Sequence, residues 1–215
     1  YLNGRAVEPD RILDPAQTDY DKKALYSAFD VTSLLVGGKN CIGVMLGAGW
    51  YNQDKVWGGG MTYGRPILRC QMRVEYASGK VETIGTDTSW KWADGPLVSC
   101  NVYQGDEYDA TREIDGWCEA SFDDSSWNDA VKAGRVIPVR MAAQEIPPMR
   151  AFAPQKASAM WRSSKEGNVW IYDFGTNLTS EVVFSASLPR GVRLQTIGSE
   201  EIDPRTREID VASTG

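Results

Sequence analysis

The sequence predicts an all-β protein built around a β-sandwich. Residues 68–76 alternate between apolar and polar side chains, which is the period of a strand with one buried face. The apolar positions are Leu68, Cys70, Met72, Val74 and Tyr76. Residues 77–80 then form a predicted turn, and residues 81–84 resume as a partner strand, which indicates a hairpin. Short strand-like runs at regular spacing, separated by turn residues, are typical of a sandwich.

Further elements follow from local patterns. A continuous apolar run at residues 41–46 predicts a central strand, and residues 98–103 and 135–139 predict two shorter ones. Single helical turns are predicted at Asp30 and at Asp123, since aspartate caps such turns well. Beyond the Pro147-Pro148 pair, strands are predicted at residues 169–175, 181–187 and 191–197.

These elements predict two domains of unequal completeness. Residues 1–146 provide enough strands for one sandwich, whereas residues 147–215 provide too few for a second, for which about 7 are usual. The chain opens on Tyr1-Leu2-Asn3-Gly4, a pattern typical of the middle of a hairpin. We therefore expect a piece cut from a longer protein, in which the second β-domain is incomplete.

Composition disfavours several classes of partner and chemistry. The net charge is −6, and no basic stripe exists to bind nucleic acid or an anionic membrane. No apolar run approaches the roughly 18 residues that span a bilayer. The absence of histidine excludes Ser-His-Asp and Cys-His catalysis and removes the commonest zinc ligand. The cysteines lack a C-x-x-C motif and are predicted to be small buried hydrophobic residues. A disulfide between Cys100 and Cys118 is the alternative that the sequence also allows.

Three carboxylates crowd the segment after a predicted strand end. Asp106, Glu107 and Asp109 follow Gly105, where the backbone can turn sharply. Several carboxylate oxygens close together suit calcium, and they also suit sugar hydroxyls. In extended chain, Asp106 and Glu107 would point to opposite faces, so this site requires a turn after Gly105. The alternative is a solvated loop whose acids pair with Arg112.

A second candidate region is the predicted loop of residues 49–66, in which aromatic residues are interspersed with glycines. Exposed tryptophan and tyrosine rings stack against sugar rings, and loops on a rigid sandwich commonly carry binding residues. The alternative is that Trp50 and Trp57 fix the loop to the edge of the sandwich. The candidate sugar-binding residues of both regions are Trp50, Tyr51, Asn52, Trp57, Tyr108 and Arg112.

Taken in order, these motifs resemble the N-terminal β-domains of bacterial α-L-rhamnosidases, family 78 of the glycoside hydrolases. The matching residues include Leu2-Asn3-Gly4, Leu13-Asp14-Pro15, Asp30-Val31-Thr32, Gly49-Trp50-Tyr51, Ser89-Trp90-Lys91, Glu107-Tyr108-Asp109, Gly116-Trp117 and Phe122-Asp123-Asp124. Asp173-Phe174-Gly175 and Asn177 match the start of the next β-domain, although Thr176 stands where the family usually has glutamine.

The resemblance implies a jelly-roll, galactose-binding-like sandwich followed by the start of a second β-domain. It implies a bacterial, periplasmic or extracellular parent enzyme that hydrolyses terminal α-L-rhamnose with carboxylates on a downstream (α/α) barrel. No catalytic residue is then expected here, and the chain alone should be inactive. Its partners would be L-rhamnose or a rhamnose-containing glycan and the barrel, with calcium as a candidate cofactor.

Two roles therefore compete for this chain: a carbohydrate-binding module and a purely structural scaffold for the barrel. A free-standing enzyme that uses Asp106, Glu107 and Asp109 is disfavoured, because nothing predicts a closed pocket that would raise the pKa of one carboxylate.

Overall fold

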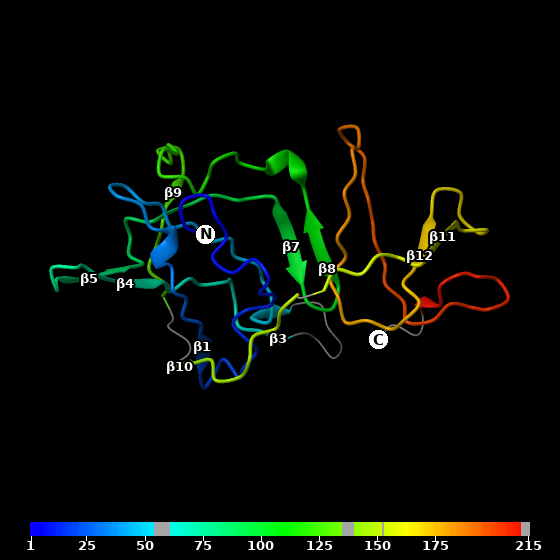
Figure 1. Ribbon diagram of the computed structural model, residues 1–215, viewed down its shortest axis with the longest axis horizontal. Helices are drawn as coiled ribbons and strands as arrows, with labels where there is room; N and C mark the ends of the chain where they lie inside the picture. Colours follow the sequence, from blue (N-terminus) through cyan, green and yellow to red (C-terminus); the bar gives the residue numbers. More distant parts are fainter. Residues whose placement is uncertain (54–60, 135–139, 152, 212–215) are drawn as a thin grey trace. The chain divides into compact units, whose positions relative to one another are not determined.

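The computed structural model describes residues 1–53, 61–134, 140–151 and 153–211 of the 215-residue chain. Its regular elements are short β-strands and two single-turn 3-10 helices, so the predicted all-β class is confirmed (Figure 1). The chain divides into two compact units, Tyr1–Arg150 and Ala151–Gly215, which are described separately. None of the helices in the described part is long and apolar enough to cross a membrane.

The strands pair two by two. The elements of unit 1 are β1 (Ala24–Tyr26), η1 (Thr32–Leu34), β2 (Asn52–Gln53), β3 (Met61–Thr62), β4 (Gln71–Glu75), β5 (Val81–Gly85), β6 (Lys91–Trp92), β7 (Leu97–Asn101), β8 (Gly105–Tyr108), η2 (Ala110–Arg112), β9 (Asn128–Asp129) and β10 (Met141–Ala143). Those of unit 2 are β11 (Ala159–Arg162) and β12 (Trp170–Asp173). The β1–β10 pair is parallel, whereas β2–β3, β4–β5, β6–β9, β7–β8 and β11–β12 are antiparallel.

The predicted hairpin of residues 68–84 is confirmed as β4–β5. Its turn closes where the Tyr76 amide donates to the Lys80 carbonyl oxygen at 2.9 Å. Met72 and Val74 are half-buried on one face while Arg73 is exposed on the other, as the alternation predicts. Tyr76 was wrongly predicted to face inward. It lies just past the ladder, is 46% exposed, and donates from its hydroxyl to Glu82 at 2.7 Å.

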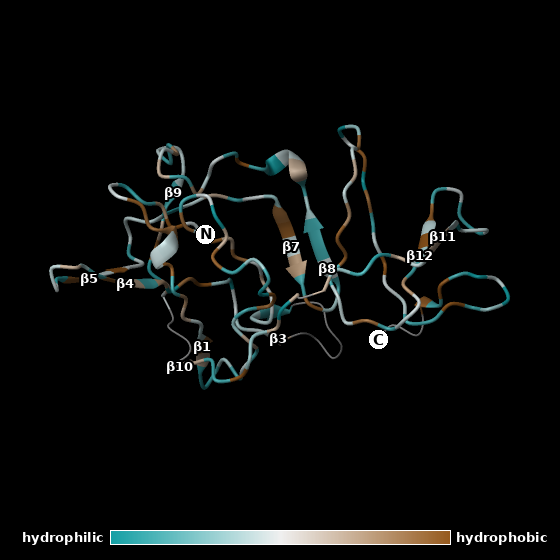
Figure 2. Cartoon of the chain, in the orientation of Figure 1, coloured by the Kyte–Doolittle hydropathy of each residue, from teal (hydrophilic) through white to brown (hydrophobic). Residues whose placement is uncertain are grey.

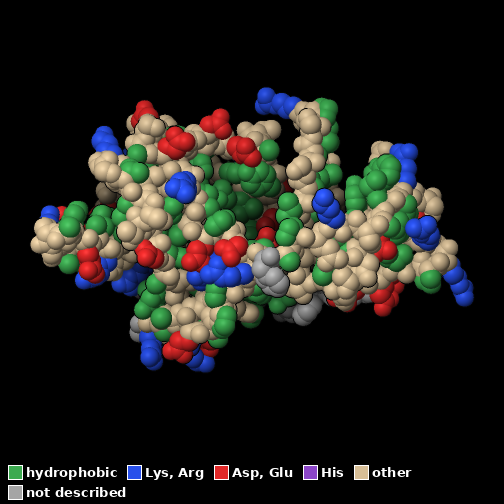
Figure 3. Space-filling view, in the orientation of Figure 1, with side chains coloured by type: hydrophobic (Ala, Val, Ile, Leu, Met, Phe, Trp, Pro, Cys, Tyr) green, Lys and Arg blue, Asp and Glu red, His purple; other side chains and the backbone are tan. Residues whose placement is uncertain are grey.

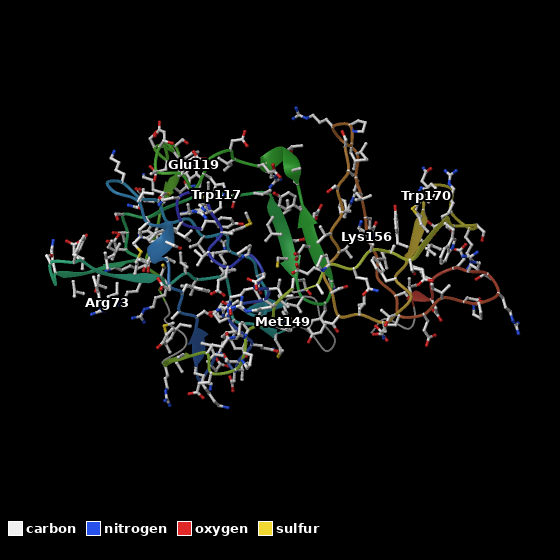
Figure 4. The ribbon with its side chains drawn as sticks, viewed as in Figure 1. Arg73, Trp117, Glu119, Met149, Lys156 and Trp170 are labelled. Atoms are coloured by element: carbon white, nitrogen blue, oxygen red, sulfur yellow. The ribbon has the colours of Figure 1, made fainter. Side chains whose placement is uncertain are left out.

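The tightest packing in unit 1 surrounds its first residues. Leu2 is only 2% exposed and bridges to Ile42, so the chain start lies along residues 41–43. The amides of the two following residues donate to the carbonyl oxygens of Cys41 and Cys118 at 2.9 Å each. Trp117, labelled in Figure 4, stacks edge to face on Tyr1 with ring centroids 5.2 Å apart. This cluster joins three distant segments of the sequence.

The two ends of unit 1 are held together. Beside the parallel β1–β10 pair, Arg11 bridges to Arg150, and the Ile12 amide donates to the Met149 carbonyl oxygen at 3.1 Å. The Arg150 guanidinium then pairs with Glu8 at 2.6 Å and with Asp10 at 2.7 Å. Residues near position 10 therefore contact residues near position 150.

Other sequence predictions have mixed outcomes. The helical turn predicted at Asp30 is confirmed as η1, and the Asp30 carboxylate accepts a hydrogen bond from the Thr32 amide. The one predicted at Asp123 was wrong, because the Asp123 carboxylate accepts from the Ser125 amide in a turn that is not helical. Residues 41–46, 181–187 and 191–197 were wrongly predicted to be strands. Apart from the Ile42 bridge, they have no ladder partner among the described residues, and apolar character alone does not make a strand without one. The strand predicted at residues 135–139 lies outside the described residues.

Candidate functional site

The acidic segment lies on a hairpin formed by β7 and β8. Cys100 pairs with Asp106 and Ser99 with Glu107, and the turn lies before Gly105, which adopts a φ of 80°. Asn101 stabilises that turn, since its side-chain oxygen accepts from the two amides that follow Val102 at 2.9 and 3.0 Å. Figure 2 shows β7 as apolar and β8 as hydrophilic.

The position of this turn separates the acids. Because the chain is extended from Gly105 onward, Asp106 and Glu107 point to opposite faces of β8. Burial raises the pKa of the Cys100 thiol, and the Asp106 carboxylate on the neighbouring strand acts in the same direction. No three Asp, Glu or Cys side chains gather in a metal-binding arrangement within the described residues, so Asp106, Glu107 and Asp109 are not brought together.

Asp109 is the N-cap residue of η2. Its carboxylate accepts from the Thr111 amide at 3.0 Å and from the Thr111 hydroxyl at 2.6 Å. The Nε of Arg112 lies 3.2 Å from its other oxygen. The hydrogen bonds from Thr111, followed by the charge of Arg112, lower the pKa of Asp109. These contacts match the interpretation in which Arg112 pairs with one acid of the segment.

Tyr108, the last residue of β8, also has a hydrogen-bond partner within this segment. Its hydroxyl donates to Glu113 at 2.8 Å. Burial raises the pKa of this phenol to about 12, and the hydrogen bond to Glu113 adds to that effect. The phenol therefore stays neutral at physiological pH and acts as a hydrogen-bond donor to a neighbouring carboxylate.

The aromatic loop residues contact other aromatic residues. Trp50 is half-buried and lies edge to face with Tyr103 at 6.4 Å between centroids. Tyr51 packs against Tyr20 at 5.2 Å and Tyr63 at 5.6 Å. These contacts fit the interpretation in which aromatic rings fix the loop. Trp57, also predicted to bind sugar, lies outside the described residues.

Two of the candidate residues, Trp50 and Asn52, line cavities. Trp50 lines a mainly apolar cavity of about 280 Å³. The other residues around it are Leu13, Ala16, Gln17, Gln144, Ile146, Pro147, Pro148 and Met149. Asn52, which accepts a hydrogen bond from the Thr62 hydroxyl, lines a different cavity of about 270 Å³ beside Cys100. Among the described residues, Trp50 and Asn52 therefore line two different cavities.

Gln144 is a polar residue at the first cavity that the sequence did not single out. Its side-chain oxygen accepts from the Ala16 amide at 3.0 Å, and its amide donates to the Ile146 carbonyl oxygen at 3.2 Å. Both polar groups are thus used within the protein. Its position just before Pro147-Pro148 was the only sequence signal.

Over the face drawn in Figure 3, basic side chains are interspersed with acidic ones.

Comparison with known proteins gives a consistent result. The family described as alpha-L-rhamnosidase N-terminal domain matches residues 1–153. An α-L-rhamnosidase of Formosa agariphila is 34% identical over 100% of this chain, which covers 23% of that protein. One of Streptomyces avermitilis is 35% identical over 95% of this chain and 20% of that protein. The chain thus spans about a fifth of the length of these curated relatives.

Solved structures agree. The α-L-rhamnosidase of Dictyoglumus thermophilum has a TM-score of 0.71 at 39% identity, covering 82% of this chain and 19% of that one. The Streptomyces avermitilis α-L-rhamnosidase complexed with L-rhamnose has a TM-score of 0.73 at 34% identity, covering 82% and 17%. From the family match over residues 1–153, we conclude that this chain belongs to the α-L-rhamnosidase N-terminal domain family.

Proposed function

We propose that this chain is a non-catalytic structural domain of an α-L-rhamnosidase, which supports a catalytic part contributed by a longer polypeptide. Family membership and the coverage of about a fifth of the relatives support this assignment. The observation that carries it is the arrangement of the acidic segment. Asp109 is hydrogen-bonded to Thr111 and paired with Arg112, while Asp106 and Glu107 face opposite ways.

A carbohydrate-binding module is the second candidate. The observation that favours it is the similarity to the Streptomyces avermitilis enzyme whose structure was solved with L-rhamnose. In this role Trp50, Tyr51, Asn52, Tyr108 and Arg112 would contact the sugar, and calcium would require Asp106 and Glu107 to converge. That convergence would require β8 to leave its ladder with β7.

The first prediction is that this chain releases no nitrophenol from nitrophenyl α-L-rhamnoside. Inverting hydrolysis needs two carboxyl groups roughly 6.5–9.5 Å apart, flanking the scissile bond, with the pKa of one raised. The pKa of Asp109 is instead lowered. The Streptomyces avermitilis enzyme serves as the positive control. Turnover that survives repurification and disappears in Asp106→Asn would contradict the proposal.

Calorimetry separates the structural role from the sugar-binding role. We expect no heat when L-rhamnose is titrated to millimolar concentration, with calcium or with a chelator, because calcium prefers 6–8 oxygen ligands that the separated acids do not supply. Heat that requires calcium and is lost in Asp106→Asn, but is kept in Asp129→Asn on the distant β9, would favour the carbohydrate-binding module instead.

A further inference from the structure

Glu208 is a buried carboxylate in unit 2 that the proposed function leaves unused. Its residue is only 7% exposed. One carboxylate oxygen accepts from the Ser163 hydroxyl at 2.8 Å, and the other accepts from the amide and the hydroxyl of Ser164 at 2.7 Å each. All three donors lie just after β11, more than 40 residues earlier in the sequence. The carboxylate therefore joins two distant segments.

Glu208 itself sits on a well-formed hairpin of residues 201–210, here called the latch hairpin. Ile202 bridges to Ile209, and the Asp203 amide donates to the Glu208 carbonyl oxygen at 2.8 Å. The turn is closed from within, because the Asp203 carboxylate accepts from the Arg205 amide at 2.8 Å and from the Thr206 amide at 3.3 Å. The latch hairpin thus has local hydrogen bonds that do not depend on Glu208.

A second contact holds the latch hairpin to β11. The Trp161 ring nitrogen donates to the Arg207 carbonyl oxygen at 2.8 Å, and the Arg207 guanidinium lies 4.3 Å from the centre of the same ring. Arg207 adopts a φ of 57°, which costs free energy in a residue with a Cβ. Neither the indole nor the guanidinium changes charge in acid, so this contact is insensitive to pH there.

The charged groups around Glu208 favour its ionised form. Hydrogen bonds from Ser164 and Ser163 lower its pKa below the ordinary 4.5, and the charge of Lys165 acts in the same direction. Arg207 adds a positive charge next to it on the hairpin, whereas Asp203 carries the opposing negative charge on its own turn. A carboxyl whose pKa is lowered by closure contributes stability above its ordinary pKa and loses it as pH falls through the lowered value.

We propose that Glu208 makes the latch hairpin a pH-sensitive latch, closed on Ser163 and Ser164 when ionised and released from them when protonated. A protonated carboxyl is a weaker acceptor than a carboxylate, so the three hydrogen bonds from Ser163 and Ser164 lose the strength that the negative charge gives them. The strain at Arg207 favours release once the carboxylate contact is lost. The remaining Trp161 contact then acts alone.

Hydrogen exchange followed by mass spectrometry on the whole chain tests this proposal. Rates are corrected for intrinsic exchange and measured near pH 7 and in steps below about pH 4, where carboxyls protonate. We expect exchange in residues 199–211 to rise on the order of tenfold in acid, the scale of one hydrogen bond to a charged group. Exchange in β12 of unit 2 and in β4–β5 of unit 1 should not follow this rise.

Two variants test whether Glu208 causes the rise of exchange in acid. Glu208→Gln should exchange rapidly in residues 199–211 already near pH 7 and show no further rise in acid. Glu200→Gln, which removes an exposed carboxylate from the same segment, should behave like the wild type. An acid response that persists in Glu208→Gln would assign it to another carboxyl group of the segment, such as Asp203, and overturn the proposal. Simultaneous loss of protection in β12 would also overturn it, since that indicates unfolding of unit 2 as a whole.

Discussion

Ile171→Ala is expected to unfold unit 2 under conditions in which unit 1 stays folded. Ile171 is 4% exposed on β12, opposite Trp161 of β11, and it is the one buried apolar side chain among the described residues of unit 2. Truncating a buried isoleucine lowers the free energy of unfolding by about 2–5 kcal/mol, through lost burial and the cavity left behind. A small domain has little more stability than that to lose.

Urea unfolding, followed by exchange in residues 159–173, measures this effect. Val183→Ala is the matched control, because Val183 is 89% exposed and its truncation should change the free energy of unfolding by less than about 0.5 kcal/mol. Equal effects of the two variants would show that Ile171 is not the core of unit 2.

Gly43→Ala is expected to destabilise unit 1 by about 1–3 kcal/mol, the usual cost of overpacking a core. A Cβ on Gly43 would lie 2.5 Å from Cζ3 of Trp117 and 2.6 Å from Cβ of Cys118. Both neighbours are held in place, since Trp117 stacks on Tyr1 and the Cys118 carbonyl oxygen accepts from the Gly4 amide.

Gly37→Ala is the control for this substitution. A Cβ there meets no atom within 4 Å, and alanine also restricts the unfolded chain, so stability should be unchanged or slightly higher. Thermal unfolding of both variants provides the comparison. A Gly43→Ala protein that melts with the wild type would show that the segment containing Trp117 can move aside.

Local patterns predicted the hairpins and turns well. The alternation at residues 71–75 and the turn after Tyr76 depend on neighbours within about ten residues, and β4–β5 forms from the two segments that were predicted to pair. The failures at residues 41–46, 181–187 and 191–197 have a common cause. Strand formation there depends on a partner elsewhere in the chain, and hydropathy carries no information on which segment supplies it.

The candidate site shows the same limit. The sequence predicted that the acids follow a strand end, whereas Asp106 and Glu107 lie on β8 itself. Arg112, the alternative partner, pairs with Asp109. It could not place the turn on one side or the other of Gly105. That placement depends on Asn101, whose side chain holds the two following amides and commits Asp106 and Glu107 to β8. Two hydrogen bonds accepted by Asn101 thus support the turn that separates the carboxylates.

The contact between the two ends of unit 1 bears on the order in which the domain can fold. β1 cannot pair with β10 until β10 has been synthesised, and Glu8 and Asp10 cannot form their ion pairs until Arg150 has been synthesised. Closing loops of more than a hundred residues is slow, because the entropy is lost before the contacts form. During translation, β1, Glu8 and Asp10 therefore remain without these partners until β10 and Arg150 have left the ribosome, and an unpaired strand edge makes a nascent chain prone to aggregate.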